Sequence, residues 1–426
     1  MTRHKLYGAQ PPSAATECGG GNRAVFREYR ESLEKMSQKS DVMTVPFHVA
    51  PVGEEEAQAA AEVIRSGWLT MGPRTFEFER QFAAYVGARH AIAVVSGTAA
   101  LHLALEAIGI KAGDEVLLPS TTFTATGEVV CYLGAKPVLV DVQPESMNFD
   151  PEDAARRITS RTRAIIPMHL SGMPCDMEQI QTLAAKHQLR TIEDAAHALP
   201  ASYHGTPIGA LSDITAFSFY ATKTLTTGEG GMITTENGQL ADRIRIMRLH
   251  GIERDAWKRY SNEGSWFYQV LEAGFKYNMT DIAAAIGLVQ LGKCDELCAA
   301  RQAIVERYNA AFKAVSCLEA PHDYADRKSA WHLYILRLRL EQLSIDRDQF
   351  ISELKKRGIS TSVHFIPLHL HPFYQNRFGY KPGDFPSAES EYRRALSLPL
   401  FPTMSDAEIN AVIAAVAEVA SAFGRK

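Results

Sequence analysis

Apolar residues recur along the chain with two different periods from residue 54 onward. Short apolar runs predict buried strands, and segments with an apolar residue every three to four positions predict amphipathic helices. Strands are expected at 91–95, 115–118, 136–142, 164–168, 189–192, 214–219 and 232–235, and helices at 54–66, 74–86, 124–133, 177–187 and directly after residue 96. This alternation predicts an α/β fold with a mainly parallel sheet covered by helices.

The last third of the chain predicts a smaller α/β domain. Helices are expected at 281–291, 295–315 and 348–357, and a strand at 331–340 turns Arg337 and Arg339 outward between apolar neighbours. Ser405 and Glu408 have the spacing of a capping box, so a final helix should begin there and end near Phe423. Because 426 residues exceed the size of one core, we expect a large domain at 43–290 and a small domain at 291–426.

Residues 1–42 differ in character from the remainder. Three consecutive glycines and scattered proline, serine and charged residues are typical of a flexible N-terminal extension. The alternatives are a start codon assigned too early, with Met36 or Met43 as the true start, and a regulatory or partner-binding arm.

Composition argues against several classes of function. With 46% hydrophobic and 22% charged residues the chain is an ordinary globular protein, and a net charge of −4 without a basic stripe argues against a nucleic-acid partner. No apolar run reaches membrane-spanning length and nothing resembles a secretory signal, so no membrane partner is expected. The six cysteines form no CxxC pair and no zinc spacing, which predicts no metal site and a reducing, cytoplasmic compartment.

Lys223 lies between two predicted strands, in the stretch 217–231 (FSFYATKTLTTGEGG). A lone lysine between strands is ordinarily a solvated side chain. Here it is flanked by small residues and glycines, which let the backbone approach a ligand closely. A lysine in such a place can lose solvation, so that its pKa falls and it serves as a Schiff-base nucleophile.

Other candidate residues lie at the carboxyl ends of predicted strands. They are Ser96, Gly97, Thr98, Phe123, His169 and Asp194, together with His197 three residues after Asp194 and with Ser218 near the end of the strand at 214–219. Singly, Ser96 and Asp194 are equally consistent with helix N-caps, and Phe123 with a core residue. In mainly parallel sheets, however, ligands lie beyond the carboxyl ends of the strands, so the common placement predicts one shared site.

Together these residues predict a site for pyridoxal 5'-phosphate. Lys223 would form the Schiff base, and Asp194, supported by His197, would keep the pyridine nitrogen protonated so that the ring accepts electrons. The helix start after residue 96 and Ser218 would hold the phosphate, because helix N-termini favour anions. Phe123 would stack on the ring.

The sequence resembles the DegT-type (DegT/DnrJ/StrS) family of pyridoxal-phosphate-dependent nucleotide-sugar aminotransferases over roughly residues 43–426. Within that family it is most similar in character to the UDP-4-amino-4-deoxy-L-arabinose type. The matching stretches are 66–73 (SGWLTMGP), 96–105 (SGTAALHLAL), 134–142 (GAKPVLVDV), 193–198 (EDAAHA), 217–231, 276–291 (KYNMTDIAAAIGLVQL), 330–336 (AWHLYIL), 362–365 (SVHF) and 397–404 (SLPLFPTM). So many ordered motifs make chance agreement very improbable.

The resemblance implies the type I fold and an amino transfer from L-glutamate to a nucleotide-linked keto sugar, such as a UDP-4-keto sugar, in surface polysaccharide or amino-sugar biosynthesis. It implies a homodimer with shared active sites, because Asn278 matches the asparagine that reaches the cofactor phosphate of the neighbouring subunit. It places Trp68, Thr70 and His364 near the sugar. In the loop 250–275, Trp257, Tyr260, Trp266 and Tyr268 are expected either to stack on the sugar or base, or to pack in the loop or at the dimer contact.

Two alternatives use the same fold. A pyridoxamine-dependent sugar dehydratase resembles this chain, but relatives of that kind have histidine in place of the lysine, so Lys223 disfavours it. A non-catalytic regulatory protein is the other alternative, and the presence of both Lys223 and Asp194 argues against it.

Overall fold

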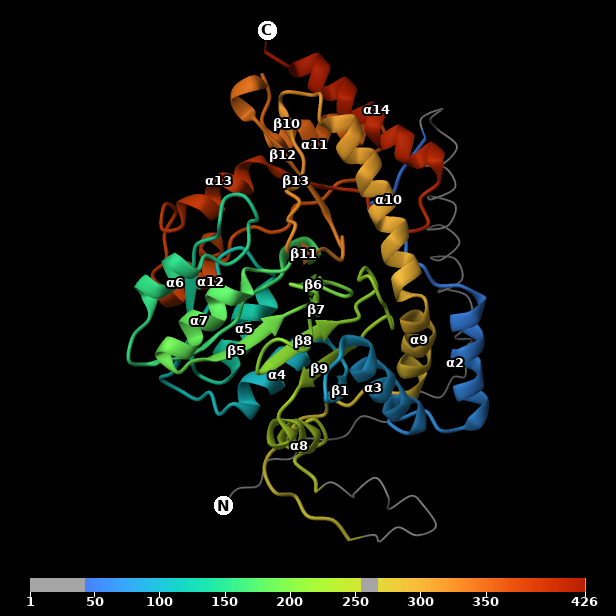
Figure 1. Cartoon of the computed structure of the whole chain (residues 1–426), viewed down its shortest axis with the longest axis vertical. Coiled ribbons are helices and arrows are strands. Elements are labelled where there is room, and N and C mark those ends of the chain that lie inside the picture. Colours follow the sequence, from blue (N-terminus) through green and yellow to red (C-terminus); the bar gives the residue numbers. More distant parts are fainter. Residues whose placement is uncertain (1–42, 254–266, 426) are drawn as a thin grey trace, which may run out of the picture. The chain divides into compact units, whose positions relative to one another are not determined.

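Seven strands form the central sheet in the order β1-β9-β8-β5-β4-β2-β3 (Figure 1). They are β1 (His90–Val94), β2 (Glu115–Pro119), β3 (Lys136–Val140), β4 (Thr162–Ile165), β5 (Arg190–Asp194), β8 (Ile214–Ser218) and β9 (Gly231–Thr235). β9 is antiparallel to both neighbours, and the pairs from β8 to β3 are parallel. The predicted fold class, an α/β protein with a mainly parallel sheet, is therefore confirmed.

The computed structural model describes residues 43–253 and 267–425. The predicted extension at 1–42 and the aromatic residues Trp257, Tyr260 and Trp266 lie outside the described residues. The described residues from 44 onward form one compact unit, so the division at residue 290 stays a prediction.

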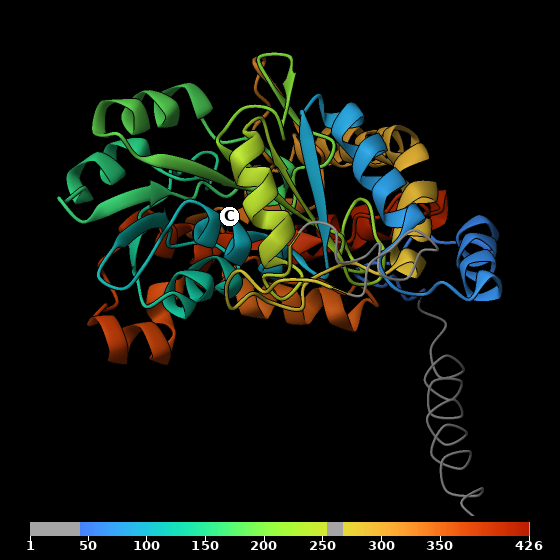
Figure 2. The same cartoon turned by 90° about the horizontal axis from the view of Figure 1, so that it is seen from below.

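Helices cover both faces of the sheet. One face carries α4 (Gly97–Ala107), α5 (Thr124–Tyr132) and α8 (Gly238–Met247), and the other carries α3 (Pro73–Val86), α6 (Pro151–Arg157), α7 (Met177–His187) and α9 (Asp281–Gly292). Figure 2 shows helices on either side of the strands. α2 (Glu54–Ser66) packs against α9 at the edge.

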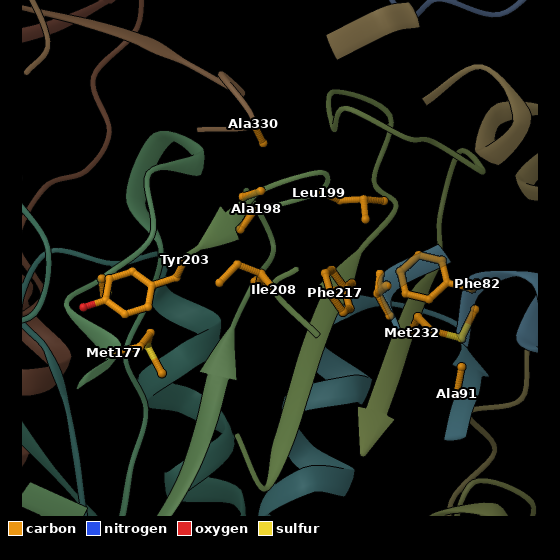
Figure 3. Packing of buried hydrophobic residues seen from close by; sticks show 14 of the residues in the cluster. Phe82, Ala91, Met177, Ala198, Leu199, Tyr203, Ile208, Phe217, Met232 and Ala330 are labelled. Atoms are coloured by element: carbon orange, nitrogen blue, oxygen red, sulfur yellow. The ribbon is translucent and has the colours of Figure 1, made fainter. Parts of the chain in front are cut away.

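The two faces of the sheet have separate cores because successive strand residues point to opposite sides. Phe217 and Met232 pack on the α3 side together with Phe82, as Figure 3 shows. Their neighbours Ala216 and Ile233 pack under α4 on the other side. A sheet that is buried on both faces explains why its strands appear in the sequence as continuous apolar runs.

A second sheet lies in the C-terminal part. It is antiparallel, with the order β10-β12-β13, formed by β10 (Leu318–Glu319), β12 (Tyr334–Leu338) and β13 (Ala395–Leu398). α10 (Cys294–Phe312), α11 (Arg347–Lys356) and α14 (Asp406–Phe423) pack around it. Val45 belongs to the same core, since it forms a parallel bridge to Ile359. The start of the described chain is thus built into its C-terminal part.

The remaining elements are short. They are a three-stranded sheet of β6 (Ser202–Tyr203), β7 (Thr206–Pro207) and β11 (Arg327–Lys328), the helices α12 (Pro372–Phe378) and α13 (Pro386–Arg394), and the 3₁₀ turns η1 (Leu170–Gly172), η3 (Leu340–Gln342) and η4 (Leu368–Leu370).

One sequence prediction for this part is wrong. Arg337 does not point outward: it is buried at 4% exposure, with its guanidinium 2.8 Å from Glu319 and donating to the carbonyls of Pro144 and Glu145. Glu319 lies on the neighbouring strand β10, so the pairing that makes burial of this charge tolerable is not local in sequence.

Candidate active site

A cavity of about 400 Å³ opens beyond the carboxyl ends of β1, β5 and β8. Nine of the predicted site residues line it: Ser96, Gly97, Thr98, Phe123, Asp194, His197, Ser218, Lys223 and His364. They come from strand ends, from the start of α4 and from loops at one sheet edge, which is where a parallel sheet leaves room for a ligand. The structure therefore brings most of the predicted residues into one place.

Lys223 is held in the loop that joins β8 to β9. Its backbone N–H donates to the carbonyl of Tyr220 at 2.9 Å. The hydroxyl of Thr226 accepts the N–H of Gly228 at 2.9 Å, and Gly228 has a φ of +81°, which glycine adopts without strain. Threonine and glycine thus shape the loop around the lysine.

The amine of Lys223 lies in a protein environment that disfavours its charge. Burial lowers its pKa to about 8, and the negative charge of Asp194 opposes that change only in part. Near neutral pH an appreciable fraction of the amine is unprotonated, which is the form that attacks a carbonyl carbon.

Asp194 is the last residue of β5 and is 3% exposed. One carboxylate oxygen accepts the hydroxyl of Thr126 at 2.7 Å and the other accepts the N–H of Ala196 at 3.1 Å. Burial raises its pKa, while these two donors, Lys223 and His169 favour the ionised form. A buried carboxylate with fixed donors is suited to face a cationic ring nitrogen.

The start of α4 forms the opposite part of the cavity. Ser96 caps the helix by accepting the N–H of Ala99 at 3.0 Å. The N–H groups of Gly97 and Thr98 precede the first intrahelical bond and line the cavity, where they can bind an anion. A Cβ at Gly97 would lie 2.8 Å from the Cβ of Ser218, so glycine allows the helix start to approach Ser218 closely.

Three histidines line the same cavity. His197 lies 4.3 Å from His332 between ring centroids, and His364 has Nδ1 2.8 Å from the hydroxyl of Ser397. Burial lowers the pKa of His364 to about 4 and that of the other two well below the ordinary value, so all three are neutral at pH 7.

Trp68, Thr70 and Asn278 do not line the cavity of their own chain. The indole N–H of Trp68 donates to the carbonyl of Met71 at 3.3 Å, and the carbonyl of Thr70 accepts the N–H of Asp281 at 3.2 Å. Asn278 is buried beside β1, where its Oδ1 accepts the ammonium of Lys276 at 2.6 Å. Their predicted roles therefore stay predictions.

Sequence reasoning missed several lining residues. They are Leu101, Ala125, Thr126, Met168, Ala196, Ala216, Tyr220, Thr222, Glu229, His332 and Phe365. Thr126 could have been found, since it is a polar residue close to the start of a helix that directly follows the candidate Phe123. His332 and Phe365 lie far along the chain, and their periodicity gave no sign that they return to this edge.

These residues fit pyridoxal phosphate. The cavity offers an amine of lowered pKa, a buried carboxylate, and a helix start made accessible by Gly97. In addition, Nδ1 of His197 is buried without a partner among the described residues. A ring with a basic nitrogen, a hydroxyl, an aldehyde and a phosphate would satisfy all four.

Comparison with known proteins agrees with this chemistry. The model of the DegT/DnrJ/EryC1/StrS aminotransferase family matches residues 51–417. The chain belongs to that family. Two relatives cover nearly the whole fold: the uncharacterized protein MJ1066 of Methanocaldococcus jannaschii is 51% identical over 370 residues (87% of this chain and 96% of the relative). The spore coat polysaccharide biosynthesis protein SpsC of Bacillus subtilis is 47% identical over 376 residues (88% and 97%).

A solved structure bears on the cofactor. Spr1654 of Streptococcus pneumoniae, assigned as a sugar aminotransferase, has a TM-score of 0.84 at 34% identity over 89% of this chain, and 98% of its own chain in the PMP form. It was also solved in a PLP form. As a member of the DegT/DnrJ/EryC1/StrS family, the protein is a PLP-dependent sugar aminotransferase of the type I fold.

When bound, pyridoxal phosphate supplies a ring that stabilises negative charge on the carbon next to the transferred nitrogen. Asp194 would hold the ring nitrogen, and the α4 start with Ser218 would hold the phosphate. Lys223 would carry the cofactor and then move a proton as general acid and base. None of the helices in the described ranges is long and apolar enough to cross a lipid bilayer.

Proposed function

We propose that this aminotransferase moves an amino group from L-glutamate to a nucleotide-linked keto sugar, such as a UDP-4-keto sugar. The observation that carries the proposal is the joint position of Lys223, Asp194 and the α4 start in one cavity. This arrangement supports a reaction in which the cofactor carries the amino group from the donor to the acceptor. The sugar acceptor and the donor rest on the resemblance to the family.

The mouth of the cavity supports a sugar acceptor. Tyr220 lines it and is 48% exposed. Exposed aromatic faces of this kind pack against the apolar faces of sugar rings and bases. His364, neutral and held by Ser397, supplies a hydrogen-bonding group for a sugar hydroxyl.

We further propose a homodimer with shared active sites. Trp68, Thr70 and Asn278 lie outside the cavity of their own chain, and a second chain would bring these residues to the site. Spore coat polysaccharide biosynthesis, given in the name of SpsC, supports a role in surface polysaccharide formation. The cysteines of the described chain, Cys131, Cys175, Cys294, Cys298 and Cys317, are free thiols, which supports a reducing compartment such as the cytoplasm.

A panel assay tests the proposal. Purified holoenzyme is incubated with L-glutamate and nucleotide-linked keto sugars, and 2-oxoglutarate and the amino sugar are measured together by mass spectrometry. We expect equal amounts of both products from the wild type and neither from Lys223→Ala. Loss of water from the sugar without gain of nitrogen would instead show the dehydratase. Absence of both reactions with every donor and acceptor would favour the regulatory alternative.

A further inference from the structure

Two buried threonine hydroxyls form a chain that ends on Asp194. The hydroxyl of Thr126 donates to Oδ2 of Asp194 at 2.7 Å, and the hydroxyl of Thr122 lies 2.8 Å from that of Thr126. Thr122 is 1% exposed and Thr126 is fully buried. Bulk water does not compete for these bonds, so their geometry is set by the protein alone.

The direction of the two hydrogen bonds follows from the number of protons. An ionised carboxylate only accepts hydrogen bonds, and a hydroxyl has one proton to donate. If Thr126 gives its proton to Asp194, it must accept the proton of Thr122. The other carboxylate oxygen of Asp194 accepts the N–H of Ala196 at 3.1 Å, so both of its oxygens are fixed from different sides.

Thr126 does not need its hydroxyl to build α5. Its N–H donates to the carbonyl of Phe123 at 3.2 Å, which closes the first turn through the backbone. The hydroxyl of Thr124, two residues earlier, donates instead to the carboxylate of Glu128 at 2.8 Å. The hydroxyl of Thr126 is therefore available for Asp194, 68 residues away in sequence.

We propose that Thr126, supported by Thr122, is a positioning residue that fixes the carboxylate of Asp194 and keeps it ionised against the ring nitrogen of the cofactor. The charged or titratable groups that act on Asp194 are Lys223 and His169, and both favour its ionised form. Burial acts in the opposite sense, so the threonine hydroxyl offsets part of the cost of burying the charge. The proposal depends on the cofactor and not on which donor or sugar is used.

The decisive comparison is Thr126→Val against Thr126→Ser. Valine keeps the shape and removes the hydroxyl, whereas serine keeps the hydroxyl. The holoenzyme is titrated without substrate and the absorbance of the bound cofactor is followed against pH. In Thr126→Val the midpoint pH of the absorbance change should rise. A less ionised Asp194 stabilises less positive charge on the ring nitrogen. With less charge on the ring, the other titrating group of the cofactor keeps its proton to higher pH. Thr126→Ser should titrate like the wild type.

A kinetic measurement accompanies the titration. For Thr126→Val, kcat with the amino donor that the wild type accepts should fall roughly ten- to hundredfold, as expected when a hydrogen bond to a charged group is lost. The KM of the donor should change far less, because Thr126 acts through Asp194. The absorbance titration needs no substrate, so it can fail independently of the proposed donor and acceptor.

Substitution of Thr122 tests whether it acts on Asp194 through Thr126. Thr122→Val should shift the midpoint in the same direction by a smaller amount, and the double variant should match Thr126→Val alone, since Thr122 acts only through Thr126. Thr121→Val is the control: its hydroxyl is buried without a partner among the described residues, and we expect no shift. The proposal would be overturned if both Thr126→Val and Thr122→Val kept the wild-type midpoint. It would also be overturned if the two shifts added in the double variant, or if Thr121→Val shifted the midpoint equally.

Discussion

The imidazole rings of His197 and His332 lie 4.3 Å apart between centroids, inclined by 46°, on the wall of the cavity. Nδ1 of each ring is buried and has no partner among the described residues. Burial lowers the pKa of both histidines well below the ordinary value, and the positive charge of Lys223 acts in the same direction. Two neutral rings thus offer hydrogen bonds to a bound molecule without adding charge to the site.

The first prediction concerns the charge of these rings. In the cofactor-free protein, His197 and His332 should titrate well below the ordinary histidine pKa near 6.5, so both rings should still be neutral at that pH. The sign follows from burial, because a desolvated imidazole resists protonation. NMR of protein labelled in its histidine rings, assigned with His197→Phe and His332→Phe, measures this directly. A midpoint close to 6.5 for either ring would contradict it.

The pH dependence of cofactor capture tests the environment of Lys223. Its pKa is lowered to about 8, and only the neutral amine attacks the aldehyde. The rate at which the cofactor-free protein binds pyridoxal phosphate should therefore rise with pH and level off above about pH 8. Stopped-flow absorbance gives the midpoint. A midpoint near 10.4, the ordinary lysine value, would show that the amine is solvated.

Replacement of Lys223 by alanine should abolish turnover and the covalent attachment of the cofactor. Its place in the β8–β9 loop puts it in the same cavity as Asp194. Borohydride treatment of the wild-type holoenzyme, followed by peptide mass spectrometry, should find the cofactor on the peptide that contains Lys223. Attachment to any other lysine would show that the site is assigned wrongly.

Asp194→Asn should fold and bind the cofactor but lose most activity. The amide keeps the shape and cannot hold a proton on the ring nitrogen. Loss of a hydrogen bond to a charged group costs roughly 1.5–3 kcal/mol, or about ten- to hundredfold in rate, and the electronic effect adds to this. Turnover is compared with Asp213→Asn as a control outside the cavity, since Asp213 is partly buried and pairs with Arg190 at the other end of β5. Near-normal turnover of Asp194→Asn would refute the role.

The boundaries of several elements could be predicted because their signals are local. α2 ends at Gly67, whose φ is +75°, and α14 starts with the reciprocal capping box of Ser405 and Glu408. The strand-end rule likewise predicted the edge at which Lys223 and Asp194 meet. Such features depend on a few neighbouring residues, so one sequence is enough to find them.

Contacts between distant parts of the chain could not be predicted in this way. Thr126 reaches Asp194 only because α5 begins at the edge where β5 ends, and His332 reaches His197 only because the C-terminal part folds back. Arg337 was assigned to the surface because an alternating strand has an outer face, yet it is buried and pairs with the partly buried Glu319 of β10. The period of apolar residues indicates which helix or strand a segment forms, but it does not identify the distant residues that the segment contacts.

The last prediction concerns the proposed dimer. Asn278 lies outside the cavity that contains Lys223 of the same chain. If the partner chain supplies this asparagine, two separately inactive variants should complement each other. Co-expressed Lys223→Ala and Asn278→Asp chains should regain activity, since one site of each heterodimer then combines the wild-type Lys223 of one chain with the wild-type Asn278 of the other.

Asn278→Asp should itself be impaired, because its carboxylate would face the phosphate of the cofactor. Like charges at about 4 Å repel by roughly 1–4 kcal/mol at intermediate to high dielectric. Differently tagged chains allow the heterodimer to be purified, and its turnover is compared with each parent homodimer. Half of the wild-type activity per dimer is expected if the sites are independent. A heterodimer that is as inactive as its parents would show that Asn278 serves the site of its own chain, because each site would then contain one altered residue. A fully active Asn278→Asp homodimer would show that Asn278 serves no site.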